Sequence, residues 1–121
     1  MNFDLEHHNA DWLRAWSDKN VELLIGLYST DCVYKDPQVT NGIIGHSALR
    51  RYLEGLFSST PPMHYTPDQI WPTHNGYCGR WYCDIGEPGN GGKLRGFDLV
   101  ILQGSKIAFN EVYVHQLTDA G

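Results

Sequence analysis

The feature that most constrains this chain is a change in the spacing of its apolar residues near residue 60. Before that point, apolar side chains recur every three or four residues, which places them on one face of an α-helix. After it, apolar and polar residues alternate, or apolar residues follow one another, in segments bounded by Gly and Pro, as is typical of strands. Helices followed by consecutive strands predict an α+β domain, with the helices on one face of a curved, mainly antiparallel sheet.

Three helices are predicted in the first half of the chain, over residues 5–16, 21–28 and 49–57. The third has the most regular pattern, because its apolar residues stand at i, i+3, i+4, i+7 and i+8 counted from Leu49. The predicted strands cover residues 32–36, 63–71, 76–86, 93–103 and 106–117, and the predicted loops cover residues 37–45 and 87–93.

Length and charge exclude several classes of protein. A chain of 121 residues predicts a single domain spanning residues 1–121. The net charge is -5 and the nine basic residues are scattered, so no positive stripe for nucleic acid is expected. No apolar run is long enough to span a membrane, and the N-terminal residues lack the pattern of a signal peptide.

The cysteines and histidines give no sign of a disulfide framework, a metal or a cofactor. The three cysteines are an odd number and include no Cys-x-x-Cys pair, which fits reduced thiols in a cytoplasmic protein. The six histidines show no ligand spacing, and no Gly-rich phosphate loop joins a strand to a helix. We therefore expect no metal and no cofactor, and a ligand that is a small apolar molecule held among aromatic side chains.

Asp98 is the most informative single residue, because it interrupts the apolar run GFDLVIL. A carboxylate is costly to bury unless it is paired or protonated. Burial would raise its pKa, which a general acid at neutral pH requires. The alternative is an ion pair with Arg80 that only shapes the core, since structural pairs also perturb pKa values.

Asp36 admits two interpretations from the residues alone. It precedes Pro37 at the end of a short predicted strand, and Asp-Pro is a common turn pair. Strand alternation also puts it on the same face as Tyr34, so its carboxylate can instead point into a pocket.

The order of motifs along the chain resembles the nuclear transport factor 2-like superfamily, and within it the SnoaL-like polyketide cyclases and ketosteroid isomerases. The motifs are WLRAWSDKNVELLIGLYSTDCVYKDP, GIIGHSALRRYLEGLF, GRWYCDIG, LRGFDLVIL and GSKIAFNEVYV. The resemblance implies a cone in which three helices pack on a strongly curved sheet and enclose a pocket. Because many members pair through the sheet, it also implies a homodimer.

The resemblance also assigns roles to individual residues. Asp36 stands where ketosteroid isomerases have the base that shuttles a proton, and Asp98 stands where a protonated aspartate binds the substrate oxyanion. Trp12 replaces the tyrosine that is the oxyanion partner in those enzymes. In SnoaL-like cyclases the aspartate of the long strand, here Asp98, is the main acid/base. Related epoxide hydrolases use an Arg-x-Asp pair, whose acid is missing after Arg80.

These expectations lead to two functional hypotheses. In the first, the protein is a cofactor-independent acid/base enzyme that acts on an apolar carbonyl or cyclic substrate with Asp98 and Asp36. The side chains expected to bind substrate are Trp12, Tyr34, Arg80, Tyr82 and Asn110. In the second, the protein is a non-catalytic, dimeric ligand-binding protein in which Arg80 neutralises Asp98. A partner-binding domain without a ligand is a third possibility.

Overall fold

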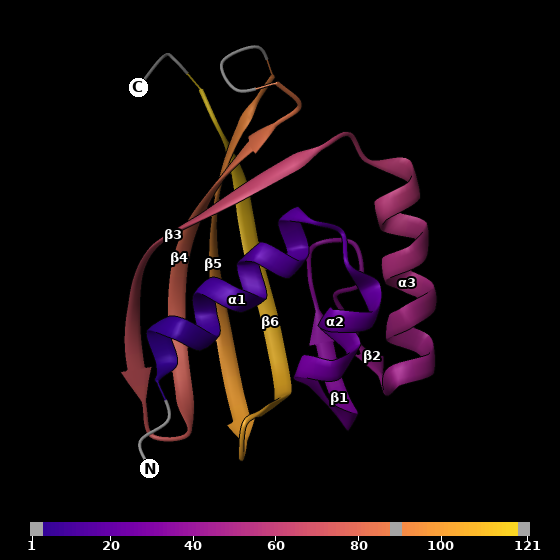
Figure 1. The fold of residues 1–121 in the computed structure, drawn as a ribbon, viewed down its shortest axis with the longest axis vertical. Helices are drawn as coiled ribbons and strands as arrows, with labels where there is room; N and C mark the ends of the chain where they lie inside the picture. The colour runs from indigo at the N-terminus through magenta and orange to yellow at the C-terminus, as the bar shows by residue number, and fades with distance from the viewer. Residues whose placement is uncertain (1–3, 88–90, 119–121) are drawn as a thin grey trace.

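The computed structural model describes residues 4–87 and 91–118. Its elements are three helices and six strands: α1 (Leu5–Ser17), α2 (Val21–Leu27), β1 (Tyr28–Lys35), β2 (Ile43–Ile44), α3 (His46–Ser59), β3 (Met63–Thr73), β4 (Gly76–Ile85), β5 (Lys93–Gln103) and β6 (Lys106–Leu117). Figure 1 shows α1 lying across the strands, while α3 stands beside β1 and β2. This arrangement confirms the predicted α+β fold with three helices packed on one sheet.

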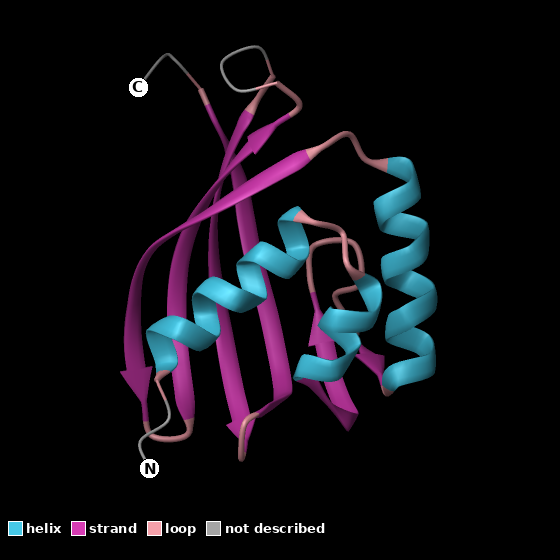
Figure 2. Cartoon of the chain, viewed as in Figure 1, coloured by secondary structure: helices cyan, strands magenta, loops and turns pink. Residues whose placement is uncertain are grey.

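The strands form a single mixed sheet in the order β2-β1-β6-β5-β4-β3. Neighbours from β3 to β6 are antiparallel, whereas β1 runs parallel to β6. The sheet curls around the helices without closing into a barrel (Figure 2). The parallel pair places Tyr34 of β1 opposite Asn110 of β6, so the end of β1 comes next to the centre of the sheet.

Several element bounds differ from the sequence prediction, since β1 begins at Tyr28 rather than at residue 32 and α3 begins at His46 rather than at Leu49. The second helix ends at Leu27 rather than Tyr28, which is extended, with φ -103° and ψ 148°. The helical spacing of Tyr28 misled the prediction, because its side chain is buried as part of a strand. The predicted loop at residues 37–45 contains the two-residue strand β2, paired with Val33 and Tyr34. In the predicted loop at residues 87–93, residues 88–90 lie outside the described residues.

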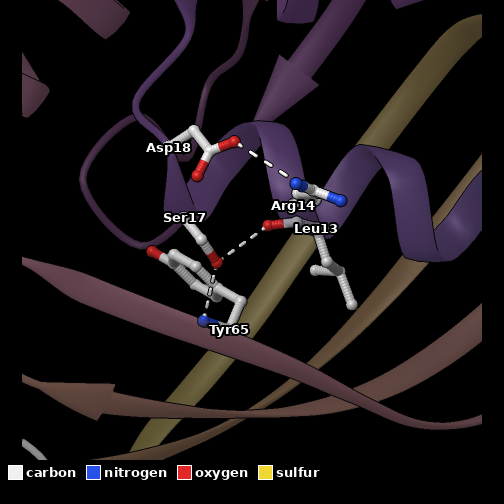
Figure 3. Close-up of polar contacts among 5 residues, drawn as sticks. All are labelled: Leu13, Arg14, Ser17, Asp18 and Tyr65. Atoms are coloured by element: carbon white, nitrogen blue, oxygen red, sulfur yellow. Dashed lines mark hydrogen bonds and ion pairs between the residues drawn. The ribbon is translucent and has the colours of Figure 1, made fainter.

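Ser17 attaches the end of α1 to the sheet, as Figure 3 shows. Its hydroxyl donates to the carbonyl oxygen of Leu13 at 3.1 Å and accepts the backbone N–H of Tyr65 at 2.8 Å. The hydroxyl thus gives the strand N–H of Tyr65 a partner at the end of the helix. This attachment fixes how α1 lies over β3. Over the residues described, no helix is long and apolar enough to cross a membrane.

Candidate functional site

A cavity lies between the helices and the inner face of the sheet. Its volume is about 170 Å³, below the range of about 300–1,000 Å³ usual for drug-sized ligands, so it suits a small ligand. The wall is formed by the C-terminal part of α1, the end of β1 and the loop after it, α3, and strands β3–β6. The lining residues are Trp12, Leu13, Trp16, Tyr34, Asp36, Pro37, Gln38, Tyr52, Leu56, Tyr65, Trp81, Leu94, Asp98, Val112 and Val114.

Asp98 lies on the inner wall of this cavity and is only 1% exposed. Trp81 Nε1 donates to its Oδ1 at 2.9 Å, and Asn110 Nδ2 donates to its Oδ2 at 3.1 Å. Burial raises the pKa of Asp98 from 3.8 to about 7, while the two donated hydrogen bonds act in the opposite direction. Among the described residues no basic side chain forms an ion pair with it. Asp98 is thus a buried carboxyl group without a counter-charge.

A chain of hydrogen bonds behind the wall holds Asn110 in place. Tyr28 donates its hydroxyl to Asn110 Oδ1 at 2.8 Å, and Trp12 Nε1 donates to the Tyr28 hydroxyl at 3.2 Å. Asn110 is fully buried, and the chain orients its amide so that the NH₂ group faces Asp98. The indole N–H of Trp12 is therefore already bound, and Trp12 contributes its ring, not a donor, to the cavity.

Asp36 sits at the mouth of the same cavity and accepts four hydrogen bonds. The hydroxyls of Tyr34 and Tyr52 donate to its Oδ2 at 2.8 and 2.6 Å. The backbone N–H groups of Gln38 and Val39 donate to its Oδ1 at 2.8 and 3.2 Å. Both interpretations of Asp36 are therefore correct, since it caps the turn after β1 and also lines the cavity.

The inner face of β4 carries Trp81, which the sequence analysis did not assign to the site. A Cβ atom at Gly96, its partner on β5, would lie 2.0 Å from Cζ2 of the Trp81 ring. The absence of a side chain at Gly96 thus gives the indole the space from which it reaches Asp98. A glycine inside an otherwise apolar strand is the sequence signal for such a close approach.

Arg80 and Tyr82 alternate with Trp81 and lie on the outer face, so the structure does not bring them to the cavity. Arg80 Nε contacts Asp68 Oδ2 at 2.7 Å, and its guanidinium stacks over Trp71 at 5.3 Å from the ring centre. The alternative of an Asp98–Arg80 ion pair is therefore wrong. Alternation had correctly separated the two faces of β4, but it could not tell which face the helices cover.

In β6, Asn110 faces the cavity side and is buried against Asp98. Glu111 points the other way and accepts a hydrogen bond from the exposed Tyr113 at 2.6 Å. An acid in the last strand is therefore not available to this cavity from Glu111. Among the described residues, no group of three or more His, Cys, Asp or Glu could hold a metal ion.

Solved structures share this fold at low sequence identity. An NTF2-like protein of unknown function from Burkholderia pseudomallei superposes with a TM-score of 0.79 at 9% identity, covering 94% of this chain and 92% of that one. A protein provisionally described as a ketosteroid isomerase from Kribbella flavida gives 0.74 at 12% identity, with coverages of 93% and 78%. The epoxide hydrolase/cyclase-like enzyme SalBIII, described in pyran ring formation in salinomycin, gives 0.73 at 14%, with coverages of 91% and 89%.

These identities establish the fold alone, because one fold hosts many chemistries. A comparison with curated proteins finds no match. The SnoaL-like domain family matches residues 10–110, which include every element from the middle of α1 to the middle of β6. The chain therefore belongs to the SnoaL-like domain family, with the nuclear transport factor 2-like fold.

Proposed function

We propose that this protein is a cofactor-independent acid/base enzyme that moves a proton on an apolar carbonyl or cyclic compound, with Asp98 as the catalytic group. The observation that carries the proposal is that Asp98 borders the cavity, is buried, and has no basic partner among the described residues. Its pKa of about 7 means that both its acid and its carboxylate forms are populated at neutral pH. A group in that state can both donate and accept a proton during turnover.

Asp36 has a different role in this proposal. Its two oxygens already accept four hydrogen bonds, so few of its lone pairs are open to a substrate proton. We assign it the positioning of the Tyr34 and Tyr52 hydroxyls at the cavity mouth. The two carboxyl groups, in unlike surroundings, then have different tasks. Asp98 transfers the proton, and Asp36 sets the shape and charge of the cavity mouth.

The site lacks one part of a ketosteroid isomerase. An oxyanion there is bound by two donors, but here the Trp12 N–H is bound to Tyr28. Asp98 in its protonated form supplies a donor to the cavity, and Trp12 and Tyr34 serve as walls. The single donor supports proton transfer by Asp98, as in SnoaL-like cyclases, more than it supports steroid isomerisation.

The test is exchange of the α-protons of a panel of cyclic ketones in D₂O, followed by ¹H NMR. The wild type should speed up exchange on at least one ketone. Asp98→Asn should lower that rate at least 100-fold, within the about 10²–10⁴ contributed by general acid–base groups. Arg80→Gln is the matched control on the outer face and should leave the rate unchanged. Unaltered exchange in Asp98→Asn would remove the basis of the proposal.

The rival hypothesis is a non-catalytic binding protein of the same fold. Its distinguishing feature was the Asp98–Arg80 contact, and Arg80 instead pairs with Asp68. A panel on which the wild type accelerates no exchange, although ligands occupy the cavity, would favour this rival.

We also propose a homodimer that pairs through the outer face of the sheet. Three large side chains are exposed there: Trp71 at 38%, Phe97 at 41% and Tyr113 at 60%. Trp71 and Phe97 already pack together, with ring centres 5.8 Å apart, so a partner would cover a continuous apolar surface. Sedimentation of the wild type and of Phe97→Glu tests this, since the substitution should give a monomer.

The cytoplasmic location stays a prediction from the sequence.

A further inference from the structure

The cavity has walls of aromatic rings that meet at steep angles. Trp12 and Trp16 lie at 88°, Trp16 and Tyr65 at 59°, and Tyr65 and Trp81 at 69°, with ring centres 5.1 to 6.5 Å apart. On the other side of Trp16, Tyr34 stacks against it at 27°. These rings pack against one another, and all five of them line the cavity.

Four of the hydrogen-bond donors of these walls are bound within the protein, whereas Trp16 Nε1 is buried and has no partner among the described residues. Tyr34 and Tyr52 donate to Asp36 at the mouth. Trp81 donates to Asp98 on the inner wall, and the Trp12 N–H is bound behind it. An anionic ligand would therefore find these four donors already occupied.

The charges of the lining have one sign. Asp36 and Asp98 are its ionisable acids, and the described lining residues include no Lys, Arg or His. A bound anion would also lie beside two carboxyl groups without a cation to offset them. A bound cation would supply the counter-charge that Asp98 lacks, and it would be attracted to the faces of aromatic rings.

From this combination we infer that the ligand of the cavity is a small organic cation, a compound that carries an alkylated ammonium group between the aromatic walls and beside the two carboxyl groups. The inference deepens the proposed function, on which it rests for the choice of cavity, by adding a positive charge to the substrate class. The substrate is then a cyclic or carbonyl compound with a tertiary or quaternary ammonium group. The cavity volume of about 170 Å³ limits this ligand to a small molecule.

The test compares two probes of nearly equal shape that differ in charge. Choline has a quaternary nitrogen where 3,3-dimethylbutan-1-ol has a carbon. Each is titrated into ¹⁵N-labelled protein while the indole N–H signals are followed. Choline should shift the Trp81 signal in a saturable manner, and the neutral alcohol should bind at least tenfold more weakly. Equal affinity of the two probes, or no saturable binding of choline, would overturn the inference.

Variants then assign the charge effect to the carboxyl groups. Asp98→Asn preserves shape and should weaken choline binding at least fivefold while leaving the affinity for the alcohol unchanged. Arg80→Gln, on the outer face, is the matched control and should bind choline as the wild type does. If Asp98→Asn fails to fold by circular dichroism, the comparison of the two probes on the wild type still decides. Binding is measured without turnover. Choline binding without exchange on any ketone of the panel, ammonium-bearing ketones included, would therefore reject the proposed catalysis and leave this inference standing.

Discussion

Replacing Asp98 by asparagine should change the way in which the free energy of unfolding depends on pH. In the folded protein the pKa of Asp98 is raised from 3.8 to about 7, mainly by burial. Between these two values the folded protein binds a proton at Asp98 that the unfolded chain has released. Stability contributed by this group is therefore fully present below pH 3.8 and is lost as the pH rises towards 7.

The magnitude follows from the distance between the two pKa values. A span of about three pH units at about 1.4 kcal/mol per unit corresponds to roughly 4 kcal/mol of lost stability by pH 8. This is a large share of the 5–15 kcal/mol typical of a whole domain. Asparagine has a similar shape and does not titrate, so the Asp98→Asn variant lacks this loss.

The assay is urea unfolding of both proteins from pH 4 to pH 8, with the difference between their free energies of unfolding plotted against pH. Taking the difference removes groups that titrate alike in both proteins. The wild type should lose stability relative to Asp98→Asn by about 4 kcal/mol over this range. If the difference stays constant, or moves in favour of the wild type as the pH rises, the pKa of Asp98 is not raised in the folded protein.

Three further predictions concern the packing around the cavity. Gly96→Ala should destabilise the protein by about 1–3 kcal/mol, because its Cβ would lie 2.0 Å from the Trp81 ring. Gly55→Ala in α3, with nothing within 4 Å of the new Cβ, is the control and should be neutral or stabilising in the same urea assay. Equal effects of the two substitutions would contradict the packing of Trp81 against Gly96. Ser17→Ala should cost about 1–3 kcal/mol in thermal or urea unfolding, because it leaves a strand N–H without its partner, and no loss would mean that water replaces the hydroxyl. Trp81→Phe should raise the pKa of Asp98 further, since it removes a donor that stabilises the carboxylate, and a lower pKa by NMR titration would contradict this.

Much of the fold was predictable because its spacing signals are local. The helical repeat from Leu49 and the strands from residue 63 onward follow from periods of 3.6 and 2. The importance of Asp98 was also predictable, because a carboxylate inside an apolar run must be paired, protonated or open to a cavity. Tyr28 shows the limit of this approach, since one residue at helical spacing was in fact the first residue of a strand.

The composition of the cavity could not be predicted in the same way. Alternation separates Arg80 from Trp81, but the choice of inner face depends on which side of the sheet the helices cover. That choice is made by contacts between distant residues, such as the one from Ser17 to the backbone of Tyr65. Gly96 indicates that the Trp81 indole points into the cavity only when the pairing of the two residues across β4 and β5 is known.

The proposed function depends on Asp98 being a buried acid that titrates near neutrality, and a measurement of its pKa decides whether it is. The measurement is a ¹³C NMR titration of the side-chain carboxyl carbons, with the Asp98 signal assigned by its absence from Asp98→Asn. We expect a midpoint of about 7 for the Asp98 carboxyl group. A midpoint at or below the ordinary value of 3.8 would show a carboxylate stabilised by a partner, and would contradict both the proton-transfer role and the pH dependence derived above.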